Sequence, residues 1–521
     1  MVQAELSPED LEHLEQRGIS PRDARRQLRF LSCPPAPQHL LRPCTVGDGI
    51  RRLEAADHDG LEERFARAEG AGRVTKLVPA SGAASRMFQS LLPYLEHPRE
   101  AQRDVLQGAA AKGDPGAAEV LRFVDNLKRF AFYGDLREAM AGLDASLAGA
   151  LHQGDLGLLL RVLLGPEFLG FAGMPKALIP FHRIGGGSRT PLEEHLVEAL
   201  SYARDSEGTC RLHFTVAAGD VPRFEAHSRA AAARLCKEVE AAAGARFDIG
   251  FSLQHPSTDT LALNRDGQPF RLSDGRLLLR PGGHGALLRN LDELGGDVVF
   301  IKNIDNVVPD AAKPPTLHWK RRLGGYLLAR QEEIFARRRA LEEGPRGVEE
   351  AIEFLVEELR VEAHHIPSGN ERRSFAAEHL HRPIRVCGVV PNTGEPGGGP
   401  FWVRGGNGRS SRQIVEAAQI AKTPEQQEIL GGATHFNPVD LVCGLRDFRG
   451  DPFELRRYVD PNTAFVSNKD HRGRPTRALE RPGLWNGAMA YWHTLFVEVP
   501  SKTFAPVKTV FDLLRPEHQG E

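Results

Sequence analysis

The chain has 521 residues, 41% of them hydrophobic and 26% charged, which is typical of a globular protein with a substantial core. Its net charge of -2 excludes the overall positive field of nucleic-acid and membrane-surface proteins. The acidic N-terminus "MVQAELSPEDLEHLEQRG" lacks a secretory leader's apolar segment, and no apolar run is long enough to span a membrane. The six scattered cysteines favour reduced thiols over disulfides or a zinc site. We therefore expect a cytoplasmic protein with no membrane or nucleic-acid partner.

The predicted elements divide the chain into four parts. Residues 1–72 are predicted to form a helical segment, with Ser7 and Pro8 starting its first helix. Strand and helix patterns alternate over 73–316, starting with the strand "RVTKLVPA" and interrupted by a helical stretch at 87–170. A charged helical segment follows at 317–382, and 383–521 mixes strands, glycine-rich loops and a helix that begins near Lys508. This alternation predicts an α/β fold with a mixed, mostly parallel sheet.

Unusual residues gather where the predicted strands end, which is where open parallel sheets bind ligands. The loop "PASGAASRM" places Arg86 after small residues that let backbone amides approach an anion, although a tight turn explains the loop equally well. It matches neither G-x-G-x-x-G nor a P-loop. Lys176 follows Pro175 in "GMPKALIPF", where the alternative is a solvated lysine at a sheet edge. His284 lies between glycines just before a predicted helix, whose N-terminus favours anions.

The strand "DVVFI" ends in a polar group that contains Asn303, Asp305 and Asn306. These side chains suit a hard cation such as Mg²⁺ that also holds substrate phosphates. They equally suit an Asx-turn, because Asn and Asp side chains bond to nearby backbone groups. Near the C-terminus, "VPSKTFAPVKTVFDLL" places Lys508 between a predicted strand and a helix, which indicates little by itself.

Taken together and in order, these segments resemble the sugar-1-phosphate nucleotidyltransferases, especially the UDP-glucose and UDP-sugar pyrophosphorylases. The resemblance rests on "SGAASRM", "PKALIPF" with "TPLEEHLVEAL", "PGGHG", "NIDN" and "FAPVKTVFDLL". The whole chain also resembles a bacterial family of this superfamily that has no assigned function. The resemblance implies a GT-A-like nucleotidyltransferase core over 73–316, with 87–170 as a helical insertion after the first strand and a C-terminal α+β region that completes the site.

The resemblance also implies a role for each matching residue. Ser81, Gly82, Ala83, Gln254 and Gly283 would bind the nucleotide, Arg86, Lys176 and Lys508 would neutralise phosphates, His284 and Asn303 would bind the sugar phosphate, and Asp305 would hold Mg²⁺. The implied substrates are an NTP, with UTP favoured by the Lys508 segment, and a sugar 1-phosphate. Nucleotidyl transfer needs positioning and charge neutralisation, and these residues supply both without a covalent nucleophile.

Two features depart from the family pattern. The stretch 87–170 separates Arg86 from Lys176, where the family usually has a short segment, so the chain must leave the site and return to it. The glycine loop reads "SGAAS" where "GGLGT" is typical, and each added Cβ narrows the backbone's approach to a nucleotide. Two alternatives therefore stay open: a non-catalytic nucleotide or nucleotide-sugar binding protein, and a GT-A glycosyltransferase.

The C-terminal region adds four further candidates. Trp485 and Asn486 could contact a carbohydrate, since an aromatic face packs on a sugar ring and an amide bonds its hydroxyl groups. The alternative is a buried Trp that anchors this region. The segment "SSRQIVEAAQI" is predicted to start a helix, with Arg409 or Arg412 as a candidate anion contact.

Overall fold

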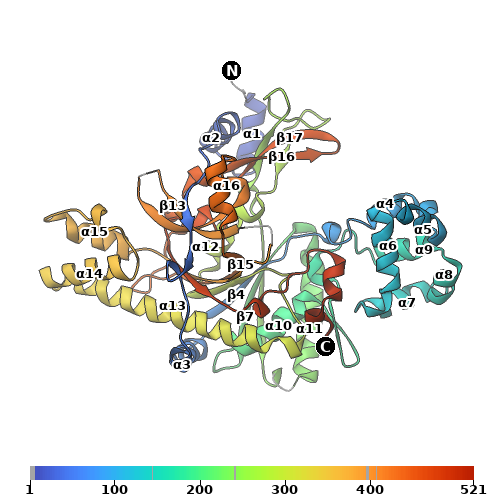
Figure 1. Cartoon of the computed structure of the whole chain (residues 1–521), viewed down its shortest axis with the longest axis horizontal. Helices are drawn as coiled ribbons and strands as arrows, with labels where there is room; N and C mark the ends of the chain where they lie inside the picture. The colour runs from blue at the N-terminus through green and yellow to red at the C-terminus, as the bar shows by residue number, and fades with distance from the viewer. Residues whose placement is uncertain (1–5, 144, 240–241, 395–397, 407, 521) are drawn as a thin grey trace. The chain divides into compact units, whose positions relative to one another are not determined.

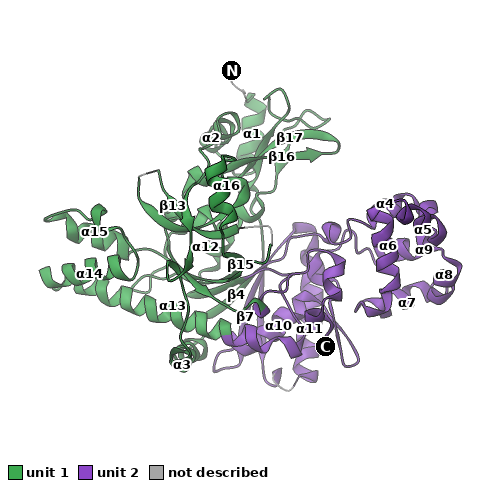
Figure 2. Ribbon diagram, in the orientation of Figure 1, with its two compact units in different colours: residues 1–77, 252–301, 319–501 green, residues 78–251, 302–318, 502–521 purple. Residues whose placement is uncertain are grey.

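The computed structural model describes residues 6–143, 145–239, 242–394, 398–406 and 408–520. The chain forms two compact units, each built from segments distant in sequence (Figures 1 and 2). Unit 1 contains residues 1–77, 252–301 and 319–501, and unit 2 contains residues 78–251, 302–318 and 502–521. No helix in the described ranges has both the length and the apolar character needed to cross a membrane. The six cysteines are free thiols, and only Cys33 and Cys236 are exposed.

A mostly parallel sheet forms the centre of unit 1. Its strands follow the order β2 (Thr45–Val46), β3 (Gly49–Arg51), β18 (His493–Glu498), β12 (Ile384–Pro391), β15 (His435–Gly444), β11 (Val298–Lys302) and β4 (Val74–Pro79). The pairs β2–β3, β3–β18, β18–β12 and β11–β4 are parallel, and β12–β15 is antiparallel. The strands β4, β11 and β12 are almost entirely buried, as expected where helices or other strands cover both faces. The predicted mixed, mostly parallel α/β architecture is confirmed.

Two smaller antiparallel sheets complete the strands of unit 1. One has the order β1 (His39–Pro43), β13 (Gly398–Arg404) and β14 (Ser410–Glu416), and the other has the order β10 (Leu279–Arg280), β9 (Thr260–Leu263), β17 (Arg474–Glu480) and β16 (Phe465–His471). Two predictions are therefore wrong. Residues 39–51 form strands although 1–72 was predicted to be helical, and "SSRQIVE" is a strand although a helix was predicted there. The reason is strand pairing: β1 and β14 both pair with β13, and β3 pairs with β18.

The helices of unit 1 follow their sequence signals closely. They are α1 (Pro8–Gln16), α2 (Pro21–Ser32), α3 (His58–Gly70), α12 (Leu287–Leu294), most of α13 (Pro314–Ala340), α14 (Pro345–Glu357), α15 (Glu371–Leu380) and α16 (Pro424–Gly431). Ser7 caps α1 through a capping box with Asp10, and Pro8 occupies the first turn, as predicted. The helix α13 packs closely on α3, where Gly324 and Gly325 leave room for Phe65 and the Leu61 backbone.

Unit 2 combines two pairs of neighbouring strands with many helices. Its strands are β5 (His182–Ile184), β6 (Gly187–Arg189), β7 (Thr209–Val216) and most of β8 (Arg246–Leu253), and its longer helices are α10 (Pro191–Tyr202) and α11 (Val221–Glu238). A bundle of short helices precedes them: α4 (Leu92–Glu96), α5 (Arg103–Ala111), α6 (Pro115–Asp125), α7 (Tyr133–Ala141), α8 (Leu147–Gln153) and α9 (Leu156–Leu164).

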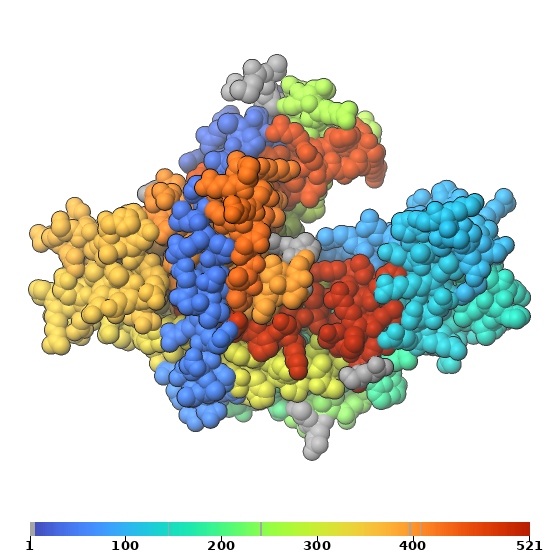
Figure 3. Space-filling view, viewed as in Figure 1, coloured from blue at the N-terminus to red at the C-terminus, as the bar shows by residue number. Residues whose placement is uncertain are grey.

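The C-terminal residues of the chain pack against this helical bundle. Val507, Val510 and Leu513 belong to the same buried cluster as the bundle's Phe123 and Phe132, and Figure 3 shows the red C-terminal residues beside the blue and cyan helices. Instead of one helix beginning near Lys508, this segment forms a 3-10 helix at Val510–Leu514 and the short helix α17 (Pro516–Gln519).

Candidate functional site

The loop that follows β4 lies beside the segment that carries Lys176. Ala80 N donates to Thr215 O of β7 at 2.8 Å, and the chain then enters a 3-10 turn at Ala84–Arg86. Ala84 N donates to Met174 O at 3.0 Å, and Lys176 N donates to Gly82 O at 3.2 Å. The residues before α4 and those after α9 are therefore hydrogen-bonded to each other, so the stretch from α4 to α9 begins and ends at one place in unit 2.

Lys176, Asp305 and Lys508 form a cluster in unit 2. Lys176 Nζ donates to Asp305 Oδ2 at 3.0 Å and to Val507 O at 2.8 Å, and Lys508 Nζ donates to the same Oδ2 at 3.2 Å. The side chains of Lys176 and Asp305 are 12% and 10% exposed, whereas that of Lys508 is 61% exposed. One buried carboxylate therefore holds a buried ammonium group and a largely exposed one.

The charges of this cluster shift the pKa of its members. Burial alone would raise the pKa of Asp305, but the attraction of Lys176 and Lys508 outweighs it and holds that pKa below its usual value. Burial lowers the pKa of Lys176; Asp305 opposes this shift, while the positive charges of Lys508 and the exposed Arg86 add to it. Asp305 is consequently ionised at neutral pH, and Arg86 lies close enough to act on Lys176.

Asn306 and Asp512 position Lys508. The Asn306 side chain accepts a hydrogen bond from Ala505 N at 2.9 Å and donates to Thr503 O at 3.4 Å, which holds the segment before Lys508 against the end of β11. Asp512 Oδ2 accepts from Lys508 N at 2.8 Å and so fixes the backbone from the other side. Sequence reasoning placed Asn306 in the polar group that suits a hard cation, not in a positioning role, and assigned Asp512 no role, although the Asp of "PVKTVFDLL" was a visible signal.

The segment "NIDN" also turns, but through a backbone hydrogen bond, whereas the alternative interpretation was an Asx-turn, in which a side chain accepts the bond. Asn306 N donates to Asn303 O at 3.2 Å, so the backbone turns here, while Asp305 points to the two lysines. Asn303 itself is half-buried. The turn and the charged cluster are thus compatible, because the turn presents Asp305.

Buried side chains on α10 contact the residues that directly precede Asp305. Lys302, which had no predicted role, donates to Glu198 at 2.7 Å with both side chains buried, and His195 Nε2 lies 3.3 Å from Ile304 O. These contacts tie the end of β11 to α10.

The helix α10 begins with a capping box between Thr190 and Glu193, and Pro191 occupies its first turn.

A second buried network ties α10 to the C-terminus. Glu194 accepts hydrogen bonds from Lys313 and from His182 Nδ1, the latter at 2.9 Å, and His182 Nε2 lies 2.9 Å from His518 Nδ1. Burial and the neighbouring His182 lower the pKa of His518 to about 3. No sequence signal indicated this network, because its members come from three distant segments, 182–194, Lys313 and His518.

The glycines around His284 lie in unit 1. Gly283 has a φ of 55° and is exposed, whereas Gly282 and Gly285 pack against Thr258 and Arg481 so closely that a Cβ would lie 2.7 and 2.6 Å from their atoms. This packing explains the glycines of "PGGHG" without a ligand.

Trp485 and Asn486 lie in the same part of unit 1 as His284. The Trp485 ring meets His284 edge-on at 4.9 Å, and His284 Nδ1 lies 3.8 Å from Glu416 Oε1. Asn486 is buried and donates to the same Glu416 oxygen at 3.1 Å, so it is part of the internal hydrogen bonding of this unit. Sequence reasoning missed Glu416.

The predicted site residues therefore divide between the units as follows. Ser81, Gly82, Ala83, Arg86, Lys176, Asn303, Asp305 and Lys508 belong to unit 2, and Gln254, Gly283 and His284 belong to unit 1. Gln254 is half-buried and directly follows β8. Of the other two candidates, Arg409 directly precedes β14 and Arg412 lies on it, where Arg412 donates to Leu359 O at 3.3 Å.

This chain is similar to the solved structure of the uridine diphosphate N-acetylglucosamine pyrophosphorylase of Trypanosoma brucei, with 14% identity and a TM-score of 0.45 over 94% of this chain and 74% of that one. The UDP-glucose pyrophosphorylase of Leishmania major gives 12% identity and a TM-score of 0.44 over 98% and 79% of the two chains. A UDP-glucose phosphorylase of Trypanosoma brucei gives 13% and 0.46 over 97% and 77%. A comparison with curated proteins gives no match. Residues 7–519 match the family described as a domain of unknown function (DUF4301), and the chain therefore belongs to this family.

Proposed function

We propose that this chain is a nucleotidyltransferase that makes a nucleotide-sugar from an NTP and a sugar 1-phosphate and releases pyrophosphate. The observation that carries the proposal is the pair of lysines, Lys176 and Lys508, on the single carboxylate of Asp305. Catalysis of phosphoryl and nucleotidyl transfer consists mainly of positioning and charge neutralisation. Two ammonium groups on one carboxylate, with Arg86 close by, supply that positive charge.

The two lysines would have different roles in this reaction. An oxygen of the sugar phosphate forms a bond to the α-phosphorus of the NTP, while the bond from that phosphorus to the bridging oxygen breaks and its electron pair leaves with pyrophosphate. Lys176 is held by Val507 O and would neutralise charge from a fixed position. Lys508 is exposed and would follow the phosphates as the charge moves.

Asp305 fits the proposed Mg²⁺. Metal ligands must be deprotonated, and the two lysines keep the pKa of this carboxyl low. Mg²⁺ is usually held by one or two carboxylates together with substrate phosphates, so a single aspartate suffices. When bound, the ion would supply further positive charge to the phosphates.

The substrates and the remaining residues are part of the same proposal. UTP is the proposed nucleotide, on the resemblance of "FAPVKTVFDLL" to the uridylyl-transferring enzymes. Ser81, Gly82, Ala83, Gln254 and Gly283 are proposed to bind it. His284 and Asn303 are proposed to bind the sugar phosphate.

Pyrophosphate exchange tests this function. The purified protein is incubated with Mg²⁺, radiolabelled pyrophosphate and a panel of nucleotide-sugars, and label should enter an NTP, with UTP preferred. Lys176→Met and Lys508→Met should each reduce the exchange rate by about two orders of magnitude or more. Lys502→Met, at an exposed lysine of the same segment, is the matched control and should keep the rate.

Two outcomes would overturn the proposal. Tight binding of a nucleotide-sugar without label in any NTP would make the chain a non-catalytic binding protein. Transfer of sugar to an acceptor, insensitive to pyrophosphate, would make it a glycosyltransferase.

A further inference from the structure

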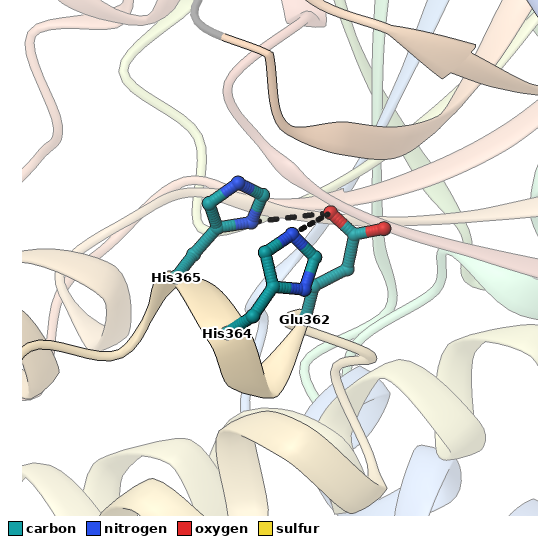
Figure 4. Close-up of side chains that lie close together, drawn as sticks. All are labelled: Glu362, His364 and His365. Atoms are coloured by element: carbon teal, nitrogen blue, oxygen red, sulfur yellow. Dashed lines mark ion pairs between the residues drawn. The ribbon is translucent and has the colours of Figure 1, made fainter.

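Three metal-binding side chains meet in unit 1, in the segment between α14 and α15. Glu362, His364 and His365 lie on and beside a 3-10 turn at Ala363–His365, and Figure 4 shows both imidazoles directed at the carboxylate. The Glu362 Oε2 atom lies 3.1 Å from His365 Nδ1 and 3.8 Å from His364 Nε2. One ligand atom from each side chain lies within 4.8 Å of the others.

These separations suit one small metal ion. Zn²⁺ binds imidazole nitrogen and carboxylate oxygen at about 2.0–2.1 Å in tetrahedral geometry, which puts neighbouring ligand atoms about 3.3 Å apart. The two measured separations from Glu362 lie on either side of that value. The His364 side chain is 71% exposed, so it can turn to close the remaining difference.

The surrounding structure fixes the carboxylate before any ion binds. His365 N donates to Glu362 O at 3.0 Å and closes the turn, and Ser410 N of β14 donates to Glu362 Oε2 at 3.2 Å. A backbone hydrogen bond to a ligating carboxylate orients it and is a usual feature of metal sites. The two imidazole rings also lie next to each other, with their centroids 4.0 Å apart.

We propose that Glu362, His364 and His365 bind a divalent transition-metal ion of the Zn²⁺ class. Imidazole ligands select Zn²⁺, Cu²⁺ and Ni²⁺, whereas Mg²⁺ prefers oxygen. This site therefore differs in kind from Asp305, whose neighbours are lysines. Three protein ligands leave one tetrahedral position for water. Because the carboxylate is also bonded to Ser410, a bound ion joins the turn after α14 to β14.

Zinc binding to the untagged full-length protein tests the inference. The exposed thiols Cys33 and Cys236 are first replaced by Ser, because thiols also bind Zn²⁺. Equilibrium dialysis in excess Mg²⁺ should then give one Zn²⁺ per chain. His364→Ala and His365→Ala should each weaken the affinity at least about tenfold. His152→Ala, at an exposed histidine of unit 2, is the matched control and should change nothing.

The absorption spectrum of bound Co²⁺ reports the number of ligands around the ion, which an affinity measurement does not. Co²⁺ bound by two imidazoles, a carboxylate and water should give the visible absorption of a four-coordinate ion, and Glu362→Gln should abolish it. Binding that is equal in wild type and in the His364→Ala/His365→Ala double variant would overturn the inference, as would displacement by Mg²⁺ alone. Far-UV circular dichroism verifies that each variant is folded. None of these outcomes depends on nucleotidyl transfer.

Discussion

Asp305 contacts two lysines that differ in burial, and this difference gives a quantitative prediction. Asp305→Asn preserves the shape of the side chain but removes the negative charge that pairs with the ammonium group of Lys176, which is 12% exposed and also donates to Val507 O. Removing one partner of a buried ion pair is destabilising by about 3–5 kcal/mol, whereas exposed pairs contribute about 0–1 kcal/mol. A double-mutant cycle should therefore give a coupling energy of about 3 kcal/mol for Asp305 with Lys176 and below about 1 kcal/mol for Asp305 with Lys508.

Catalysis should not follow the same order. Both lysines neutralise phosphate charge in the proposed reaction, so Lys176→Met and Lys508→Met should reduce pyrophosphate exchange by similar factors, about 100-fold or more. We therefore expect Lys508→Met to reduce the exchange rate strongly while changing the free energy of unfolding only slightly. Equal coupling energies for the two pairs would refute the electrostatic reasoning, and full activity of Lys508→Met would refute its role.

Urea unfolding followed by two signals measures these energies. All four tryptophans, at positions 319, 402, 485 and 492, lie in unit 1, so their fluorescence follows that unit. Far-UV circular dichroism follows the helices of both units. Since the cluster lies in unit 2, the substitutions should change the circular dichroism transition.

Three further predictions follow from burial and packing. Burial lowers the pKa of Lys176 below 10.5, so exchange activity, measured as kcat/KM, should fall as the pH rises through a value under 10.5. A decrease in kcat/KM that begins only above pH 10.5 would contradict this prediction. His518 stays neutral in the folded chain because its pKa is about 3, whereas the unfolded chain binds this proton near pH 6.5. Stability should therefore fall as pH drops, by about 2 kcal/mol between pH 7 and pH 5 for this group, and urea titrations of His518→Gln should show a weaker pH dependence. Gly325→Ala should destabilise the chain by about 1–3 kcal/mol, because its Cβ would lie 2.0 Å from Leu61 O, while Gly60→Ala, with open space around it, should leave the thermal midpoint unchanged or raise it.

The sequence predicted those parts of the fold that depend on local patterns. The strands β4, β7, β8 and β11 and the helices α10 to α12 match the expected alternation, since each carries its own periodicity and cap. Membership of a family without assigned function is also confirmed. The strands at 39–51 could not be predicted, because β1 pairs with β13 and β3 with β18, each more than 300 residues away. Such pairing overrides local propensity.

The candidate site divides in a similar way. Lys176, Asp305 and Lys508 were proposed together from a resemblance, and the structure brings them together in unit 2. What stayed hidden is the support: Asn306 holding the segment before Lys508, and Glu198 pairing with Lys302. A buried Glu or Asn in a sequence is indistinguishable from an exposed one until its partner, often a hundred residues away, is known.

The two lysines also predict different tolerance to arginine. The one negative charge of Asp305 faces the two positive charges of Lys176 and Lys508. The cluster therefore has a net positive charge, which would attract a triphosphate. Lys176 donates to both Asp305 and Val507 O in a buried site, and we expect the larger planar guanidinium not to reproduce these two bonds there. Lys508 is exposed, and its contact with Asp305 is weak enough to be exchanged for a phosphate. Lys508→Arg should therefore keep a measurable fraction of pyrophosphate exchange, while Lys176→Arg should be as inactive as Lys176→Met. The reverse order would mean that Lys508, not Lys176, acts from a fixed position.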